Sequence, residues 1–385
     1  MIDSVLFIAN AVSAFVWLLL LCMPSRWCMG ERWESAGYFY ANVSKWPSLS
    51  VIVPARNESA SLPTTLPSWL AQDYPEAEII LVDDNSNDFT SECAGDIAVR
   101  SNRIVRVLSG SRPPMNWTGK LWALQQGVNA SSSDWLLFTD ADIYHNPNLW
   151  RGLVAKAISE RRSMVSLMAL LDTRGRWASL LIPAFVYFFH ILYPFGKVRE
   201  PHSGISAAAG GCILISRCAL DTIGGISGYS HAWIDDLALA KRVKGAGLSV
   251  SLSLTKSAVS IRPYSCLCDI WQMVARNAFS QLKYSWIALV GTVVGMLILF
   301  LLPVMGVCMY PFFPVSLAAA LLSFTALALM AVTYIPILRF FGMTIVRSFT
   351  LPIAGILYLA MTLTSAVNYV KGKREWRGAR IDVSL

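Results

Sequence analysis

The sequence predicts an α/β domain built on a Rossmann-like, mostly parallel sheet, with one membrane helix before it and two to three after it. Of the 385 residues, 15% are charged, whereas a soluble domain has about 25%. Charges are missing from three stretches, 4–25, 284–338 and 348–370, and the remaining chain is about 20% charged. Within it, residues 48–145 alternate short β-branched runs with helical patterns, as βαβ units do. This pattern excludes an ordinary soluble enzyme and an all-membrane transporter.

The first apolar stretch, roughly 5–22, is long enough to cross a bilayer core of about 30 Å as a helix. A cleaved signal peptide is the alternative. The residues before the stretch, however, include Asp3 and neither Lys nor Arg, and no clean cleavage site follows. We therefore expect residues 1–25 to form an uncleaved transmembrane anchor.

The second stretch, 284–338, is long enough for a hairpin of two membrane helices, roughly 287–310 and 315–338. The last region, 339–385, holds a third apolar segment at 351–370 and a basic tail. That third segment is either another span or a helix lying in the membrane interface.

The basic residues that follow the first stretch are Arg26, Arg32 and Lys45. By the positive-inside rule they place residues 26–283 in the cytoplasm, which for a bacterial chain means a multi-pass protein of the inner membrane. The tail carries a net charge of +4 between residues 371 and 380, half of the net +8 of the chain. If 351–370 spans the bilayer, this tail lies outside, against the rule, and the sequence leaves the conflict open.

The segment 177–196 is uncharged and rich in aromatic residues, although it lies inside the polar region. Aromatic side chains prefer the headgroup level of a bilayer, and Pro183 and Pro194 disfavour one straight span. We expect an interfacial helix that dips into the cytoplasmic leaflet, with a buried core helix as the alternative.

The α/β region places acidic side chains directly after its strands. The predicted strands are 49–53, 78–82, 104–108 and 135–139, and the predicted helices between them are 58–72 and 119–130. The residues that follow strand ends are Pro54, Asn57, Glu58, Asp83, Asp84, Asp140 and Asp142. Ligands of open α/β sheets bind at this edge, and Mg²⁺ or Mn²⁺ is held by one or two carboxylates together with substrate phosphates. A single Asp at a strand end is usually a turn former or helix cap, but two acidic clusters at one edge favour a site.

Three further features lie in the same region. Gly119 and Lys120 open a helix whose N-terminus suits a phosphate, although no P-loop or dinucleotide motif is present. Residues 207–215 bring small side chains to a buried strand, either to leave room for a substrate or to allow close strand packing. Asp235 and Asp236 begin an amphipathic helix at 234–247, where they either cap the helix or form a general base whose pKa is raised by burial and a like-charged neighbour.

Taken in order, these motifs resemble the family 2 glycosyltransferases of GT-A fold over residues 48–283. The matching motifs are Val51-Ile52-Val53-Pro54-Ala55-Arg56-Asn57-Glu58, Val82-Asp83-Asp84-Asn85-Ser86-Asn87-Asp88, Gly119-Lys120, Asp140-Ala141-Asp142 and Asp235-Asp236-Leu237-Ala238-Leu239-Ala240. The N-terminal anchor, the tract 273–282 and the closing apolar segments are most similar to the hopene-associated branch, found with bacterial hopanoid synthesis.

The resemblance implies a role for each matching residue. Donor binding falls to Pro54, Asn57, Glu58, Asp84, Lys120, Asp140 and Arg276, with Asp84 on the base, expected to be uracil. Asp142, helped by Asp140, would hold the divalent metal on the donor diphosphate. Asp236 would be the catalytic base, with Asp235 beside it. The Gln-x-x-Arg-Trp motif of processive members is missing, because Asn277 follows Arg276, which leaves Arg276 as a diphosphate contact only.

The resemblance therefore implies an inverting, metal-dependent hexosyltransferase that moves one sugar from a nucleotide sugar, expected to be a UDP-sugar, to a membrane lipid. A hopanoid is the first acceptor to consider. A polyprenyl phosphate or another glycolipid precursor is the alternative, and a non-catalytic membrane scaffold is a third. We expect no nucleic acid partner, because the excess positive charge lies largely in the tail.

Overall fold

The computed structural model describes residues 2–35, 43, 45–313, 315–372, 375–376 and 379–380. The chain forms two compact units. The helical unit comprises Met1–Gly30, Thr173–Pro194 and Tyr264–Asp382, and the strand unit comprises Glu31–Asp172, Phe195–Pro263 and Val383–Leu385. Each unit is described by itself.

The strand unit is built on an eight-stranded sheet in the order β3-β2-β1-β4-β7-β6-β8-β5. Its strands are β1 (Leu49–Ala55), β2 (Ala77–Asp83), β3 (Val105–Ser109), β4 (Trp135–Thr139), β5 (Ile143–His145), β6 (Met164–Leu170), β7 (Cys212–Ser216) and β8 (Val250–Ser260). The four strands expected from the sequence form the parallel half, β3-β2-β1-β4. In the other half, β7 runs antiparallel to both β4 and β6, while β6 and β8 are parallel.

The parallel half explains why acidic residues gather at one edge. The register pairs Leu49 with Ala77 and with Trp135, so β1, β2 and β4 begin level with one another and run in the same direction. At the other end, Ala55 is paired with Asp83. The loops that leave these three strands therefore meet at one edge of the sheet, as the sequence predicted.

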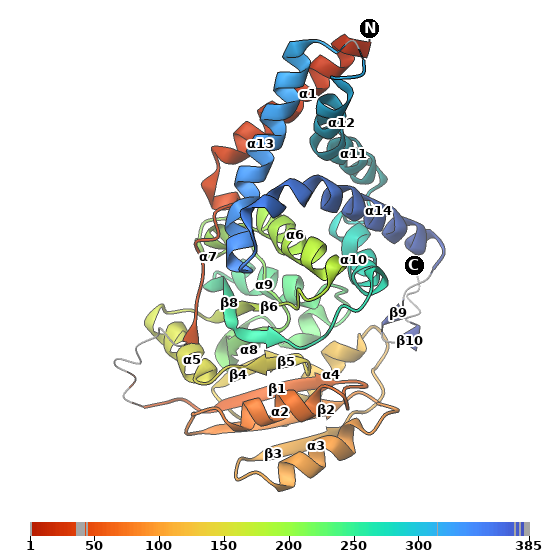
Figure 1. The fold of residues 1–385 in the computed structure, drawn as a ribbon. Coiled ribbons are helices and arrows are strands. Elements are labelled where there is room, and N and C mark those ends of the chain that lie inside the picture. Colours follow the sequence, from red (N-terminus) through yellow and green to blue (C-terminus); the bar gives the residue numbers. More distant parts are fainter. Residues whose placement is uncertain are drawn as a thin grey trace. The chain divides into compact units, whose positions relative to one another are not determined.

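Both faces of this half are covered by helices. The helices of the strand unit are α2 (Leu62–Leu70), α3 (Thr90–Val99), α4 (Gly119–Asn129), α5 (Leu149–Ser159), α7 (Phe195–Arg199), α8 (Arg217–Thr222), the 3₁₀ turn η3 (Ile226–Tyr229) and α9 (Asp235–Gly245). Ile79 and Leu81 of β2 belong to the core that includes side chains of α2 and α5, whereas Ile80 and Val82 pack with Ala123 of α4. Because side chains alternate along a strand, α2 and α4 cover opposite faces. Figure 1 shows α2 and α3 side by side next to β1, β2 and β3.

The helices of this half differ from the prediction at one boundary and in one additional helix. The helix expected at 58–72 begins at Leu62, because Pro63 suits the first turn of a helix and the preceding residues form a turn. Helix α3, between β2 and β3, was not expected from the sequence. The helix expected at 234–247 is α9, and the one expected at 119–130 is α4.

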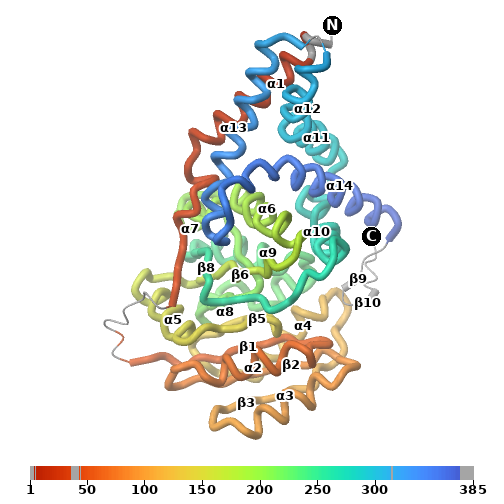
Figure 2. Tube along the Cα trace, viewed as in Figure 1, coloured from red at the N-terminus to blue at the C-terminus, as the bar shows by residue number. Residues whose placement is uncertain are grey.

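The helical unit gathers segments from three parts of the chain. Its helices are α1 (Ile2–Leu21), the 3₁₀ turn η1 (Pro24–Arg26), α6 (Arg176–Leu192), α10 (Leu267–Gln281), α11 (Trp286–Met296), the π-helical turn η4 (Leu297–Leu301), α12 (Leu302–Met309), α13 (Leu317–Phe340), the 3₁₀ turn η5 (Ile345–Thr350) and α14 (Leu351–Val370). A short pair, β9 (Glu375–Trp376) and β10 (Ala379–Arg380), follows. Figure 2 shows α1 running beside α13, and the two helices are in contact.

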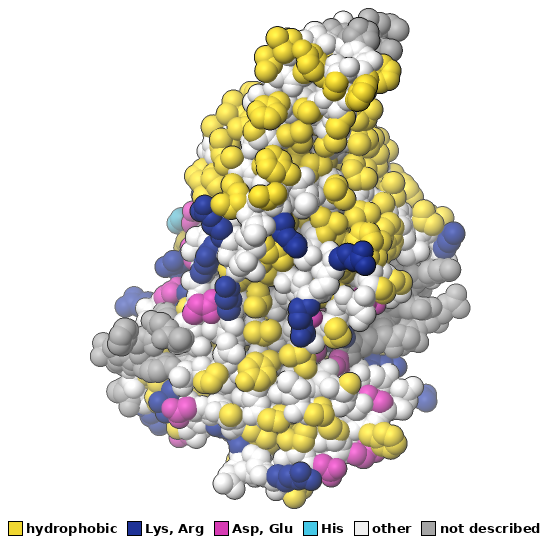
Figure 3. All heavy atoms as spheres, viewed as in Figure 1, with side chains coloured by type: hydrophobic (Ala, Val, Ile, Leu, Met, Phe, Trp, Pro, Cys, Tyr) yellow, Lys and Arg dark blue, Asp and Glu magenta, His cyan; other side chains and the backbone are white. Residues whose placement is uncertain are grey.

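Among the residues that the structure describes, three segments are long and apolar enough to cross a membrane, namely Trp286–Met309, Leu317–Phe340 and Ile345–Val370. They match the three apolar segments predicted after the α/β domain. Hydrophobic side chains cover much of the visible surface of the helical unit, as expected for contact with lipid (Figure 3). The described apolar part of α1, Leu6–Leu21, is shorter, so the predicted N-terminal anchor stays a prediction. Part of the predicted basic tail, at 373, 374 and 377, lies outside the described residues.

The aromatic segment at 177–196 covers α6 from Trp177 onward and the first two residues of α7. Tyr187 of α6 hydrogen-bonds Thr333 at 2.7 Å, and the Tyr358 hydroxyl donates to the Leu181 carbonyl at 2.9 Å. The middle of α6 is therefore packed among other helices of its unit, which favours the buried-helix alternative there. Trp177 and Leu192, at its two ends, are exposed.

Candidate active site

A pocket in the strand unit lies where the loops after β1 and β4 meet the first turns of α4 and α9. Its lining combines one amine and three carboxylates with apolar and small side chains. The lining residues are Pro54, Lys120, Leu121, Leu124, Phe138, Thr139, Asp140, Gly210, Ile213, Tyr229, Asp235, Asp236 and Leu239. Concave sites with a few convergent charged groups are where ligands bind and where chemistry occurs.

Lys120 is the cation at the centre of this pocket. The Thr118 hydroxyl accepts a hydrogen bond from the Leu121 N–H and so caps α4, which fixes Lys120 in the first turn. The Lys120 ammonium lies 2.9 Å from Oδ1 of Asp140 and 3.2 Å from Oδ2 of Asp235. Burial lowers the pKa of Lys120, but Asp140 and Asp235 outweigh burial and raise the pKa above its usual value. Lys120 therefore stays charged and joins the end of β4 to the start of α9.

The carboxylate of Asp236 is held by two backbone N–H groups. The close ion pairs of Lys120 are instead with Asp140 and Asp235. Its Oδ2 accepts the Gly210 N–H at 2.9 Å, and its Oδ1 accepts the Leu237 N–H at 2.7 Å. Burial and the neighbouring negative charge of Asp235 raise the pKa of Asp236 to about 7, against the opposing effect of Lys120 and the two hydrogen bonds. A carboxylate with this pKa can accept a proton near neutral pH and release it again.

The small residues before β7 allow close packing, one against charged side chains of the pocket and one against the sheet. At Gly210, an added Cβ would lie 3.3 Å from the Lys120 Nζ and 3.4 Å from the Asp236 Oδ2, so glycine leaves room for the charged cluster. At Gly211, an added Cβ would lie 3.3 Å from the Ile143 Cδ1, so that glycine allows close packing. Ala207 and Ala208 are fully buried.

The acidic turn, which we define as residues 140–142, follows β4. Asp140 faces Lys120, while Oδ2 of Asp142 lies 3.3 Å from Nε of Arg262. Arg262 also lies 3.8 Å from Oε1 of the buried Glu58, and 46% of its side chain is exposed. Among the described residues, no group of three His, Cys, Asp or Glu side chains is arranged to hold a metal ion. Two carboxylates in one turn nevertheless fit Mg²⁺ or Mn²⁺, which need only one or two when substrate phosphates supply the other oxygens.

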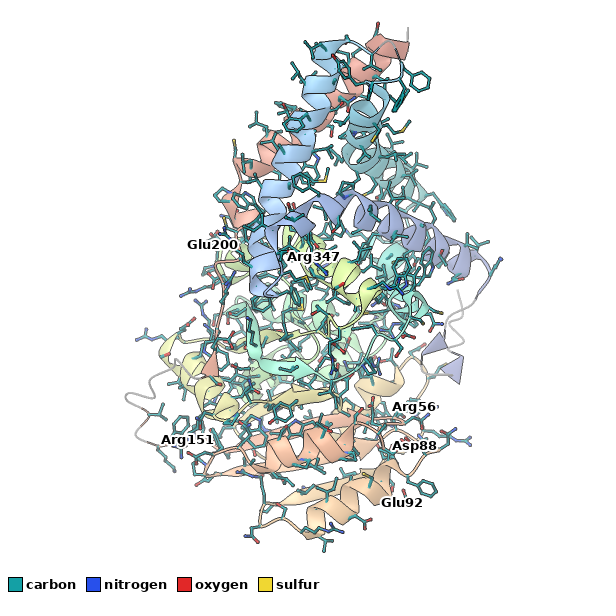
Figure 4. The ribbon with its side chains drawn as sticks, viewed as in Figure 1. Arg56, Asp88, Glu92, Arg151, Glu200 and Arg347 are labelled. Atoms are coloured by element: carbon teal, nitrogen blue, oxygen red, sulfur yellow. The ribbon has the colours of Figure 1, made fainter. Side chains whose placement is uncertain are left out.

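The loops after β1 and β2 hold each other at the same edge. Asp84 is buried and lies 3.4 Å from the Arg56 guanidinium, and the Asn57 N–H donates to Oγ of Ser86 at 2.9 Å. Both Asn57 and Asn85 have positive φ angles, of 54° and 53°, a backbone conformation that Asn tolerates better than most residues. Figure 4 labels Arg56 and Asp88 on these two loops.

A comparison with protein families matches residues 50–224 to the model described as glycosyl transferase family 2. Over this segment, which is less than half of the chain, the sequence is similar to family 2 glycosyltransferases. The chain is 39% identical over 99 residues to the 4,4'-diaponeurosporenoate glycosyltransferase of Staphylococcus haemolyticus (26% of this chain and 25% of the relative). It is 30% identical over 138 residues to the probable glycosyltransferase YdaM of Bacillus subtilis (34% and 32%). The matches thus span about a quarter to a third of the length of these relatives.

Among solved structures, the chain resembles the mannosyltransferase PcManGT from Pyrobaculum calidifontis, in complex with GDP-Man and Mn²⁺. The TM-score is 0.58 at 16% identity, covering 97% of this chain and 100% of that one. At this identity the likeness concerns the fold alone, and it confirms the predicted GT-A fold.

The pocket of the strand unit brings together five of the residues singled out in the sequence: Pro54, Lys120, Asp140, Asp235 and Asp236. The predicted donor and metal residues Asn57, Glu58, Asp84 and Asp142 lie in the neighbouring loops and do not line the pocket. Arg276 lies in α10 of the helical unit, and its role stays a prediction.

Two residues of the strand unit were missed by the sequence analysis. Tyr229 lines the pocket and is 4% exposed, and burial together with Asp235 raises its pKa. Arg262 pairs with Asp142 and Glu58. Arg262 follows a strand, and a basic residue there is only a weak sequence signal for a site. Tyr229 lies in a Gly-rich loop, where the sequence does not distinguish a pocket residue from a core residue.

Proposed function

We propose that the protein is an inverting glycosyltransferase that moves one hexose from a nucleotide sugar to a hydroxyl group of a membrane lipid. The observation that carries the proposal is Asp236, a carboxylate with a pKa raised to about 7, held in the pocket beside Asp235 and Lys120. A general base of this kind is what an acceptor hydroxyl needs at neutral pH.

In this proposal Asp236 takes the proton of the acceptor hydroxyl as its oxygen attacks the anomeric carbon of the donor sugar. The bond between that carbon and the diphosphate oxygen breaks, and the nucleoside diphosphate leaves with the electron pair. A single displacement of this kind inverts the anomeric configuration. The Gly210 N–H keeps Oδ2 of Asp236 in place, and Asp235 keeps the pKa high enough for proton transfer.

The donor would bind along the edge formed by the loops after β1, β2 and β4. We assign the base, expected to be uracil, to Asp84 with Pro54, Asn57 and Glu58 nearby. Lys120 and Arg276 are assigned to the phosphates. The mutual bonding of the loops after β1 and β2 supports a preformed site.

Asp142, with Asp140, would hold a divalent cation, Mg²⁺ or Mn²⁺, whose charge would stabilise the leaving diphosphate. The partial exposure of Arg262 lets its guanidinium turn toward solvent and release Asp142 for that purpose. The structural neighbour with GDP-Man and Mn²⁺ supports this assignment by its fold.

The acceptor is proposed to be a lipid because three segments of the chain are long and apolar enough to cross a membrane. The resemblance to the hopene-associated branch favours a hopanoid, and a polyprenyl phosphate is the alternative. The relatives are named for chemically different molecules, one for 4,4'-diaponeurosporenoate and another for poly-β-1,6-N-acetyl-D-glucosamine, so these similarities leave the acceptor open. We place the protein in the bacterial inner membrane, with the catalytic domain facing the cytoplasm.

The test incubates membranes containing the full chain with a panel of labelled UDP- and GDP-sugars and Mn²⁺, followed by lipid extraction. We expect label in one lipid class, and mass spectrometry then identifies sugar and acceptor. Asp236→Asn should lower transfer by about 100- to 10,000-fold, the usual contribution of a general base, and leave UDP binding within a few-fold. Transfer by the Asn variant at the wild-type rate would refute the base, and no labelled lipid with any donor would favour the scaffold.

A further inference from the structure

Helix α2 carries a polar stripe that is buried against the segment after β4. Thr65, Ser68, Trp69 and Gln72 are all at most 6% exposed, and their spacing of three or four residues puts them on one side of the helix and its C-terminal extension. Helix α2 contacts β5, which follows the acidic turn. Buried polar side chains need hydrogen-bond partners, and here those partners are backbone groups.

The partners all lie in one stretch of chain, residues 141–146. The Thr65 hydroxyl donates to the Ala141 carbonyl at 2.8 Å. The Trp69 Nε1–H donates to the Ile143 carbonyl at 2.9 Å. Ser68 and Gln72 continue the series: the Ser68 hydroxyl accepts the residue-145 N–H at 3.1 Å, and Gln72 Nε2 donates to the carbonyls of residues 145 and 146 at 3.2 and 2.9 Å.

A second set of hydrogen bonds, centred on His145, holds the same stretch. The indole N–H of Trp150 donates to Nδ1 of His145 at 2.9 Å, so the imidazole proton is on Nε2. That nitrogen lies 3.1 Å from Oγ1 of Thr139, which in turn donates to the Gly211 carbonyl at 2.9 Å. Burial lowers the pKa of His145 to about 3, so the ring stays neutral. Thr139 and His145 thus join the residues on the two sides of the acidic turn.

We propose that Thr65 and His145 are positioning residues that fix the acidic turn so that Asp140 and Asp142 present their carboxylates to one divalent cation. The inference rests on the proposed function, because it assigns the cation to these two carboxylates. The Ala141 carbonyl held by Thr65 lies between the two aspartates in the chain. A rotation of that peptide group would turn the two side chains apart.

The buried polar side chains of α2 could also serve only to stabilise the fold, and that role predicts a different experimental result. If the stripe served stability alone, losing one hydroxyl would lower the melting temperature and leave the effect of a cation on nucleotide binding unchanged. If it positions the acidic turn, losing the hydroxyl would weaken the cation-dependent part of binding selectively. The ratio of UDP Kd without Mn²⁺ to UDP Kd with Mn²⁺ separates the two roles.

The experiment measures this ratio by calorimetry on the full chain in detergent, with UDP and, in parallel, GDP. Thr65→Val keeps the side-chain shape and removes the hydroxyl, and Thr65→Ser retains it. Thr64→Val is the matched control, because Thr64 is the exposed neighbour on the same helix. We expect the ratio to fall about tenfold in Thr65→Val and to stay at the wild-type value in Thr65→Ser and Thr64→Val. His145→Phe, which keeps a ring but loses both nitrogens, should lower the ratio as well.

A wild-type ratio in Thr65→Val, with a lowered melting temperature, would overturn the positioning role. The same ratio loss in Thr64→Val would overturn it too, because it would show a general effect of changing the helix. A wild-type protein that binds either nucleotide equally well with and without Mn²⁺ would overturn the proposed cation site and this inference together. A protein with a large ratio that is insensitive to Thr65 and His145 would overturn the inference alone.

Discussion

The charge of Asp235 should set the pH at which the enzyme becomes active. Two causes raise the pKa of Asp236 to about 7, burial first and Asp235 second, while Lys120 lowers it. In Asp235→Asn the second cause is gone. The variant also frees Lys120 from its 3.2 Å contact with the Asp235 carboxylate, so its charge acts more fully on Asp236. Both consequences lower the pKa of Asp236, so the direction of the shift is fixed.

The size of the shift can be bounded. The pKa of Asp236 lies about three units above the 3.8 of an ordinary aspartate, which corresponds to about 4 kcal/mol at about 1.4 kcal/mol per unit. Burial is the larger cause and is unchanged in the variant. We therefore expect a fall of about one to two units, with three units as the ceiling.

The assay is the pH profile of kcat/KM for the nucleotide sugar between pH 5 and 9, which reports groups of the free enzyme. The wild type needs Asp236 ionised, so its activity should rise with pH through a midpoint near 7. In Asp235→Asn the midpoint should lie near pH 5 to 6, whatever the maximal rate. Asp221→Asn, an exposed carboxylate of α8, should keep the wild-type midpoint. An unchanged midpoint in Asp235→Asn would show that Asp235 does not tune the base or that the base is another group.

Three other outcomes follow from the same geometry. Lys120→Met removes the charge that lowers the pKa of Asp236, so the midpoint of the same pH profile should move upward; a downward move would contradict the assigned sign. Gly210→Ala puts a Cβ 3.3 Å from the Lys120 Nζ and should lower kcat about tenfold, whereas Gly95→Ala, in open space on α3, should leave kcat unchanged. A fluorescent reporter fused to the C-terminus should fluoresce, because the net charge of +4 favours a cytoplasmic tail; activity of an alkaline phosphatase reporter there would instead place α14 across the bilayer.

The part of the fold that the sequence predicted is the part made by neighbouring segments. The strands β1, β2 and β4 carry largely apolar runs that are buried on both faces, and parallel pairing with right-handed crossovers leaves few alternatives. Strands β6 and β8 pair across more than 80 residues, and β7 is inserted between β4 and β6. Nothing local in these strands specifies a partner so far along the chain, so the mixed half of the sheet had to come from the structure.

The candidate site shows the same division. That Asp140 lies at the ligand-binding edge followed from its place at a strand end, which is a local signal, whereas Asp236 was assigned to the same site by the family resemblance. That Lys120 bridges Asp140 and Asp235 did not follow, because a lysine at a helix N-terminus predicts a phosphate contact. Arg262 and Tyr229 reach their positions through the long-range pairing of the sheet and the packing of η3, so their roles depend on tertiary structure.

The charge balance of the pocket bears on how a donor can enter. The pocket is lined by three carboxylates and by Lys120. Two of these carboxylates, those of Asp140 and Asp235, already lie 2.9 and 3.2 Å from the Lys120 Nζ. A nucleoside diphosphate would bring further negative charge into this partly buried space, where charges interact more strongly than in water. Lys120 cannot offset both the carboxylates and the diphosphate. A donor that arrives with a divalent cation on the acidic turn removes this conflict, because the cation neutralises the carboxylates of β4 and leaves Lys120 to the phosphates and to Asp235. The pairing of Lys120 with Asp140 and Asp235 therefore favours a donor that binds together with a divalent cation.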